Sequence, residues 1–389
     1  MNQQVYQQLV RQFREHFGVA PSVAAYAPGR VEILGNHTDY NEGLVLSAAI
    51  NCGTFFVATP ARDGVCRLVA GDVNEECRFA LSAVAPAKTM AWANYVKGVW
   101  AGLTARHPLA HGFWGMFRGD VPLGAGLSSS AALEMSAGLA LCAVYGIKLD
   151  PLDLAKIGQA AEHRYAGVKC GLLDQMTSLF GREDALVLSD FRALSVETVP
   201  LGAEACFLIC NTAVKHALVE SEYNERRERC EEAARFFAQA LAHPVRALRD
   251  VSWEEWARLA PRMDPVVARR AAHIVGENTR VAEGRQLLAA HKLAAFGALM
   301  FVSHESSRTQ FENSCAELDR LVACARETEG VLGARLSGGG FGGSAVMLVR
   351  VQDAPAVAER IAACYGEAFG HPCTTMIVRP AAGGMVLDV

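Results

Sequence analysis

A short polar stretch near the N-terminus carries side chains that suit the binding of a small polyol. Val31, Ile33 and Leu34 predict a short buried strand, after which come His37, Asp39 and Asn41. Imidazole, carboxylate and amide groups brought to one place can exchange hydrogen bonds with several hydroxyl groups at once. An ordinary surface turn would account for the same residue types, because loops are generally polar. Other motifs in the chain must separate these two interpretations.

A glycine- and serine-rich segment over residues 119–132 favours phosphate binding. Gly124 and Gly126 let the backbone approach a phosphate without a Cβ in the way, and a helical pattern begins just after them. Free N–H groups at the start of a helix attract an anion. The chain has no G-x-x-x-x-G-K-S/T motif, which excludes a P-loop. A dinucleotide-binding loop is disfavoured, since Ser129 stands where its third glycine would be.

A second glycine-rich loop lies directly before a strand pattern late in the chain. Residues 338–343 read Gly-Gly-Gly-Phe-Gly-Gly. Each glycine would cost about 1 kcal/mol inside a helix, so a regular element is excluded there. A flexible linker is the alternative, but linkers are uncommon between the apolar strands of a packed domain. The segment therefore predicts a loop that comes close to another group.

In this order and at these distances, the three segments resemble the three motifs of the GHMP small-molecule kinases, and those of the galactokinase branch most closely. The sugar-binding signature of that branch resembles Gly29–Gly43, its phosphate motif resembles Pro122–Ala132, and its third motif resembles Ser337–Ser344. Shorter similar pieces include Trp92–Gly98 and Ser221–Arg227. The resemblance thus covers most of the chain, from roughly residue 20 to residue 350.

The resemblance implies an α/β fold of the α+β two-domain kind, the GHMP kinase fold. A ribosomal-protein-S5-like N-terminal domain is expected over residues 1–195, and a ferredoxin-like C-terminal domain over residues 196–389. Hydrophobic patterns in the chain agree with such a mixture of elements. They predict helices over residues 131–146, 152–166, 221–241 and 354–368, and strands over residues 345–351 and 375–378.

The activity that the resemblance implies is ATP-dependent phosphorylation of a sugar at its C1 hydroxyl, with galactose as the substrate. A sugar hydroxyl is a poor nucleophile at neutral pH, so in-line transfer from ATP needs a proton acceptor and charge compensation. Asp174 is the expected base, and Arg30 is expected beside it. Two alternatives stay open: a kinase for a related sugar, such as a galactosamine derivative or a C6-modified hexose, and a non-catalytic galactokinase-like regulator that senses sugar and ATP.

The resemblance also assigns the other site residues. Magnesium, which accompanies ATP, is expected on the oxygen atoms of Ser130 and Glu162, because a hard cation prefers oxygen ligands. The residues expected to contact the sugar are Arg30, Asn36, His37, Asp39, Gly171, Asp174 and Tyr223. Those expected to contact ATP are Gly124, Gly126, Leu127, Ser128, Ser129, Ser130 and Ala131. The third-motif loop comprises Gly338, Gly339, Gly340, Gly342 and Gly343.

Three positions depart from the usual galactokinase pattern. This chain has Asn36 where glutamate is usual, Glu32 where asparagine is usual, and Ser47 where proline is usual. The usual glutamate is expected to accept a hydrogen bond from the C6 hydroxyl of the sugar. Asn36 can still accept one, but it has lost the charge and gained a donor. Recognition of C6 is therefore where this chain is expected to differ.

Composition fits an enzyme with small ligands. A chain of 389 residues that is 51% hydrophobic is long enough for two cores, and its net charge of −4 argues against a nucleic-acid surface. Residues 1–17 predict an amphipathic helix rather than a signal peptide, and no apolar stretch reaches the roughly 20 residues that span a bilayer. We expect a cytoplasmic protein that binds sugar and ATP without nucleic-acid or membrane partners, as a monomer or weak homo-oligomer. Its twelve cysteines are expected to be reduced thiols.

Overall fold

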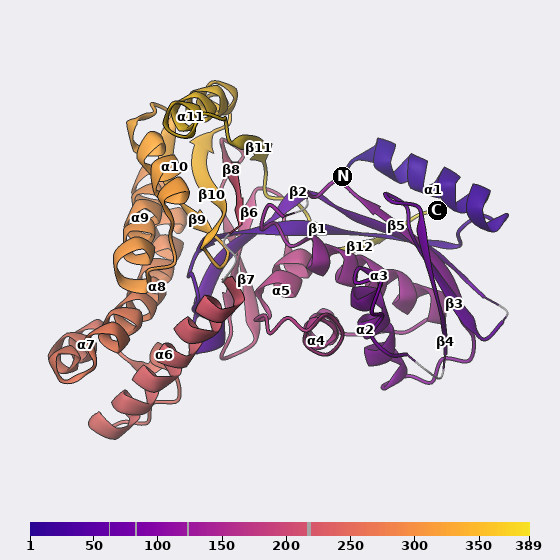
Figure 1. The fold of residues 1–389 in the computed structure, drawn as a ribbon, viewed down its shortest axis with the longest axis horizontal. Coiled ribbons are helices and arrows are strands. Elements are labelled where there is room, and N and C mark those ends of the chain that lie inside the picture. Colours follow the sequence, from indigo (N-terminus) through magenta and orange to yellow (C-terminus); the bar gives the residue numbers. More distant parts are fainter. Residues whose placement is uncertain (62, 82–83, 123, 216–218) are drawn as a thin grey trace.

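Two sheets with helices on their faces make up the structure, a computed structural model that describes residues 1–61, 63–81, 84–122, 124–215 and 219–389 (Figure 1). The strands are β1 (Val23–Leu34), β2 (Leu44–Pro60), β3 (Val65–Ala70), β4 (Glu75–Ala80), β5 (Phe113–Gly119), β6 (Ala185–Asp190), β7 (Ser195–Pro200), β8 (Ala205–Lys215), β9 (Val331–Ser337), β10 (Gly342–Arg350), β11 (Thr374–Val378) and β12 (Met385–Leu387). The helices are α1 (Gln3–Phe17), α2 (Ala93–Thr104), α3 (Ser129–Tyr145), α4 (Pro151–Ala161), α5 (Leu173–Phe180), α6 (Val219–Ala240), α7 (Trp253–Leu259), α8 (Pro265–Ala289), α9 (Leu293–Ser306), α10 (Ala316–Glu327) and α11 (Ala354–Phe369).

The larger sheet has helices on both faces. Its strands run in the order β12-β1-β2-β5-β3-β4, and β6 and β7 extend it beside β2. Helix α1 lays Leu9, Phe13 and Phe17 on one face, as their four-residue spacing predicts. Helices α2 to α5 lie on the other side of the sheet (Figure 1), where Trp100 and Phe56 share a core. The last strand, β12, pairs with β1, so the end of the chain returns to this sheet.

The smaller sheet packs on one face against the larger sheet and on the other face against its own helices. Its order is β11-β8-β10-β9, and its strands pair antiparallel. Successive side chains of a strand point to opposite faces. Leu208 therefore packs with α10 and α11, whereas Phe207 and Ile209 share a core with β1, β2 and α8. The two sheets and their helices confirm the predicted α/β fold class, while the predicted domain limits stay a prediction.

The cysteines differ from what was predicted. Cys324 of α10 and Cys364 of α11 form a disulfide, so the expectation that every cysteine is a reduced thiol is wrong for this pair. The two helices pack against each other on the smaller sheet, which brings together two residues that are 40 positions apart in sequence. The other ten cysteines are free. Within the described ranges, no helix is long and apolar enough to cross a membrane.

Candidate active site

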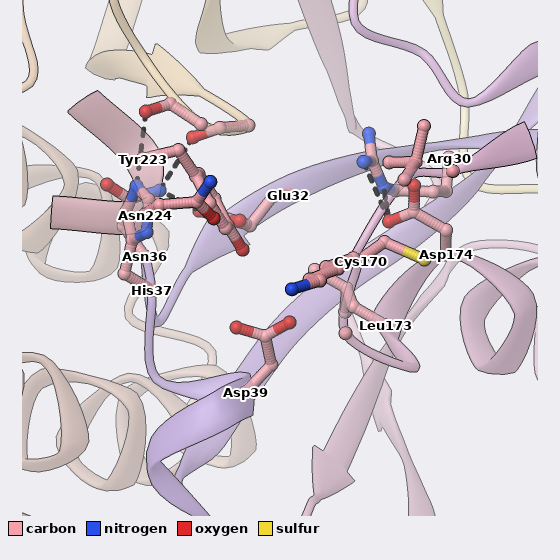
Figure 2. Close-up of a pocket in the computed structure, with 16 residues that line it drawn as sticks. Arg30, Glu32, Asn36, His37, Asp39, Cys170, Leu173, Asp174, Tyr223 and Asn224 are labelled. Atoms are coloured by element: carbon pink, nitrogen blue, oxygen red, sulfur yellow. Dashed lines mark hydrogen bonds and ion pairs between the residues drawn. The ribbon is translucent and has the colours of Figure 1, made fainter. Parts of the chain in front are cut away.

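A cavity of about 340 Å³ lies between the first strand of the larger sheet and the β9–β10 loop of the smaller one (Figure 2). Its volume falls within the roughly 300–1,000 Å³ of small-molecule sites. The structure brings all of the residues predicted to contact the sugar to its wall, together with two residues of the third glycine loop. These residues are Arg30, Asn36, His37, Asp39, Gly171, Asp174, Tyr223, Gly338 and Gly339.

The turn after β1 is anchored by a distant buried carboxylate. Gly35 N and Asn36 N donate to Oε2 of Glu277 in α8, at 2.8 and 2.9 Å. Burial disfavours the charge of Glu277, but Arg280, foremost among its charged neighbours, holds the pKa of that carboxyl well below its usual range. An ionised carboxylate accepts strong hydrogen bonds from backbone N–H groups. The polar signature is therefore a fixed part of the fold and not a mobile surface turn.

Asp174 stands at the centre of a hydrogen-bond cluster in the first turn of α5. Its Oδ1 accepts from Nε of Arg30 at 2.7 Å, with Nη2 of the same guanidinium in ion-pair contact at 2.7 Å, and its Oδ2 accepts from Ser128 Oγ at 2.5 Å. Burial disfavours the charge of Arg30, but the adjacent Asp174 outweighs it and raises the pKa of the guanidinium. A carboxylate has about four lone-pair sites. One on each oxygen is used here by a recorded hydrogen bond, which leaves Asp174 able to accept from a ligand.

Asp39 is a second carboxyl in the cavity. A Cβ at Gly171 would come within 1.7 Å of its Oδ2, so only glycine fits beside it. Burial, and next the charge of Glu32, raise the pKa of Asp39 to about 7. A ligand that donates hydrogen bonds to this group would favour its ionised form. Asp39 can therefore recognise hydroxyl groups.

His37 is fully engaged by the protein. Its Nε2 lies 3.1 Å from the carbonyl of Gly339, and its Nδ1 lies 2.8 Å from the hydroxyl of Tyr40. A carbonyl can only accept, so Nε2 carries the proton and Nδ1 accepts from Tyr40. Burial lowers the pKa of His37 to about 4, which leaves the ring neutral at physiological pH. His37 thus fastens the third glycine loop to the polar signature.

Asn36 is engaged in the same way. Its Nδ2 donates to Glu32 Oε1 at 2.9 Å and to the Gly338 carbonyl at 2.7 Å, and its Oδ1 accepts from Asn313 Nδ2 at 2.9 Å. The loop meets Asn313 again at Gly340, which has a φ of 82° and where a Cβ would lie 2.1 Å from the Asn313 carbonyl oxygen. The third glycine loop was predicted to come close to another group, and the groups it approaches are Asn36 and Asn313 of the cavity wall.

The predicted phosphate loop leads from β5 into α3. Gly124 and Gly126 have positive φ values of 74° and 72°, and Ser128, at the N-cap of α3, also has a positive φ of 54°. No side chain caps the helix start, so the N–H groups of its first turn can bind an anion. The Ser128 hydroxyl instead reaches Asp174, which joins this loop to the cavity. Leu123, within the predicted motif, lies outside the described residues.

Ser130 and Glu162 form a pair of oxygen donors near the same helix start. Ser130 Oγ donates to Glu162 Oε1 at 2.9 Å, and Glu162 opens a π-helical turn that ends at Gly167. Burial, followed by the charge of Asp174, raises the pKa of Glu162. A cation bound by Ser130 and Glu162 would offset the repulsion between the carboxylates of Glu162 and Asp174. Hydroxyl and carboxylate oxygens suit Mg²⁺, which keeps several waters and phosphate oxygens as its remaining ligands.

Some residues of the site were not predicted as contacts. Glu32 lines the cavity, although the sequence marks it only as a departure from the usual galactokinase pattern. Its position two residues after Arg30, which puts both side chains on one face of β1, is the signal that could have identified it. Glu277, Asn313 and Arg335 support the cavity wall from behind. They come from distant elements and lie in no motif, so nothing local in the sequence marks them.

Comparison with protein families gives three matches along the chain. The model of the GHMP kinases N terminal domain matches residues 94–182, and that of the GHMP kinases C terminal matches residues 285–367. The model of the galactokinase galactose-binding signature matches residues 11–60. These matches include the polar signature, the phosphate loop and the third glycine loop described above.

Individual relatives match over almost the whole chain. A galactokinase of Chloroflexus aurantiacus is 39% identical over 371 residues, which cover 95% of this chain and 95% of that protein. A galactokinase of Roseiflexus sp. is 37% identical over 383 residues, covering 98% and 97%. The crystal structure of Lactococcus lactis galactokinase complexed with galactose has a TM-score of 0.92 at 33% identity, over 98% of this chain and 99% of that chain.

A more distant structure shares the fold. A crystal structure of mevalonate kinase has a TM-score of 0.63 at 17% identity, over 93% of this chain and 100% of that chain. The predicted resemblance is thus confirmed by sequence models at both ends of the chain, by relatives of nearly equal length and by the arrangement of the two sheets. The chain belongs to the galactokinase branch of the GHMP kinase family.

Proposed function

We propose that this sugar kinase transfers the γ-phosphoryl group of ATP to the C1 hydroxyl of galactose, with Asp174 as the general base. The observation that carries the proposal is the position of Asp174, which lines the cavity and is hydrogen-bonded to Ser128 of the phosphate loop. The Asp174 carboxylate therefore lies between the cavity expected to hold the sugar and the loop expected to hold ATP. Galactokinase relatives and the match to the galactose-binding signature support the choice of sugar.

Recognition of the sugar rests on the cavity wall. Asp39 accepts hydrogen bonds from ring hydroxyls, and Gly171 leaves the space that its carboxylate needs. Tyr223 of α6 lines the cavity and offers an apolar ring with a polar tip. A sugar epimer that fails to donate to Asp39 would leave the carboxylate without a partner. The lost interaction should weaken binding of that epimer by about 1–3 kcal/mol or more. This site therefore selects among hexoses.

Transfer follows from the cluster around Asp174. Asp174 takes the proton of the C1 hydroxyl as that oxygen forms its bond to the γ-phosphorus, and the bond between the γ-phosphorus and the leaving ADP oxygen breaks. Arg30, fixed against Asp174 and against the Gly126 carbonyl at 2.6 Å, orients the carboxylate and offsets charge on the phosphoryl group. No covalent intermediate on the protein is needed.

The nucleotide is held by the loop before α3. Backbone N–H groups of residues 128–131 face the phosphates, and the positive φ values of Gly124 and Gly126 shape the approach. Ser130 and Glu162 would hold Mg²⁺, which when bound neutralises phosphate charge. We further infer that the protein acts in the cytoplasm as a monomer or weak homo-oligomer, with sugar and ATP as its partners.

A coupled assay of ADP release tests this function. Purified protein with ATP and magnesium is offered galactose, glucose, galactosamine, N-acetylgalactosamine and galacturonate. We expect release with galactose well above that with the other sugars. Release with another sugar instead would overturn the substrate but keep the kinase. Binding of sugar and ATP without ADP release from any sugar would favour the non-catalytic regulator.

A further inference from the structure

Glu32 has one oxygen atom that the fold leaves without a partner. Its Oε1 accepts from Asn36 Nδ2 at 2.9 Å and from Arg335 Nη1 at 2.8 Å. For Oε2, no hydrogen-bond partner occurs in the part of the chain that the structure describes, and the side chain lines the cavity. Glu32 is only 5% exposed, so water has little access to it. A largely buried carboxylate oxygen that faces a ligand cavity is well placed to accept a hydrogen bond from the ligand.

The position of Glu32 is fixed by its surroundings. Arg335 is fully buried, and the one hydrogen bond of its guanidinium within the described residues goes to Glu32. Removing either partner would leave a buried charge without compensation, which is strongly unfavourable. Asn36 braces the same oxygen while its other amide atoms are bound to Gly338 and Asn313. Glu32 therefore presents Oε2 in one direction, as a site that is pre-organised before the ligand arrives.

Asn36, by contrast, has both of its N–H donors engaged within the protein. Both hydrogens of its amide and its carbonyl oxygen are directed at protein atoms. The side chain that was expected to meet the C6 group of the sugar is thus occupied as a brace. The adjacent carboxylate of Glu32 has an oxygen, Oε2, with no partner among the described residues, so it can accept a hydrogen bond with the full strength of a charged group.

We propose that Glu32 is the specificity-determining residue for the C6 hydroxyl of the sugar, and that Asn36 and Arg335 position it. The proposal rests on the proposed function, in which C1 lies at Asp174. In a pyranose ring the C6 hydroxymethyl group lies across the ring oxygen from C1. Figure 2 shows Glu32 on the side of the cavity near Asn36, away from Asp174. A primary hydroxyl can rotate toward a single fixed acceptor, which suits one free carboxylate oxygen.

The test compares kcat/KM for galactose, 6-deoxygalactose and 4-deoxygalactose in the wild-type protein and in Glu32→Gln. A hydrogen bond to a charged group is worth about a tenfold change or more, so the wild type should prefer galactose over 6-deoxygalactose by at least about tenfold. Glu32→Gln should lose about tenfold on galactose and less than about threefold on 6-deoxygalactose. Glu197→Gln, which changes an exposed carboxylate paired with Arg285, is the control and should keep the wild-type pattern.

A second variant guards against misfolding and against reorientation of the new amide. Glu32→Leu combined with Arg335→Met removes both buried charges, and replacing a buried ion pair by apolar groups is often tolerated. It should fold and show no preference between galactose and 6-deoxygalactose. Equal losses of kcat/KM on galactose and 6-deoxygalactose would overturn the assignment to C6. So would a variant that loses kcat/KM on 6-deoxygalactose but keeps it on 4-deoxygalactose, because Glu32 would then contact the C4 hydroxyl. If the wild type uses another hexose, the proposed function fails, and that hexose and its 6-deoxy form then test Glu32.

Discussion

Replacing Asp174 with asparagine isolates the role of its charge. The substitution keeps the shape of the side chain and an oxygen that can accept from Arg30 at the position of Oδ1. The new amide nitrogen would face Ser128 Oγ, which can accept as well as donate, so both contacts survive in altered form. What is lost is the proton acceptor and the negative charge opposite Arg30.

The expected magnitude follows from this change. A positioned general base contributes about 10²- to 10⁴-fold to turnover, so we expect kcat to fall by at least about 100-fold in Asp174→Asn. ATP affinity should change by less than about threefold, because the backbone of the phosphate loop and the start of α3 are unaltered. The pair with Arg30 is largely buried, with 10% and 22% of the two side chains accessible, so removing the charge opposite Arg30 should also lower stability, which the unfolding curve measures.

The assay is steady-state ADP release, together with calorimetric titration of ATP and a thermal unfolding curve. Asp39→Asn is the matched comparison, since it makes the same chemical change at the other carboxyl of the sugar site; it should raise KM for galactose more than it lowers kcat. A kcat for Asp174→Asn within about tenfold of the wild type, with normal folding, would refute the assignment of the base.

The remaining predictions concern the cavity wall. Burial raises the pKa of Asp39 to about 7 from 3.8, so its contribution to stability is present below the unfolded pKa and is lost as pH rises through about 7. Between about pH 6 and about pH 8, Tm of the sugar-free wild type should therefore fall relative to Asp39→Asn, while KM for galactose falls in the wild type only; parallel curves would contradict this. Gly171→Ala should lower kcat/KM by about 100-fold without unfolding, because the new methyl group displaces Asp39; unchanged kinetics would contradict the packing. Gly340→Ala should destabilise the protein by at least about 1 kcal/mol in urea unfolding, since its φ of 82° disfavours a side chain and Asn313 blocks the space; an unchanged midpoint would contradict this.

Local signals in the sequence were sufficient for the elements that carry motifs. The four-residue apolar spacing of α1 and the serine-rich start of α3 identify those helices directly, because one face or one end of each has a distinct composition. The clustering of Arg30, Asp39 and Asp174 was predicted through family resemblance, since these residues are far apart in the chain. The structure brings them together through β1, the turn after it and α5.

The supports of the site could not be predicted in this way. Glu277 and Arg335 act through burial and through contacts across more than 200 residues, and neither lies in a short pattern with chemical meaning. The disulfide between Cys324 and Cys364 depends on how α10 and α11 pack on the smaller sheet, which no spacing reveals. For Asn36, the sequence indicates what the amide can bond to, but only the structure shows that protein atoms already bond to it.

The identity of the phosphorylated product tests directly whether this protein is a galactose 1-kinase. Protein, ATP, magnesium and galactose labelled with ¹³C at C1 are incubated, and phosphorus and carbon NMR spectra of the product are recorded. We predict a phosphate coupled to the labelled anomeric carbon, formed in step with ADP, and formed at least about 100-fold more slowly when Asp174→Asn replaces the wild type. A sugar phosphate without coupling to the labelled carbon, or ADP formed without a phosphorylated sugar, would contradict phosphorylation at C1.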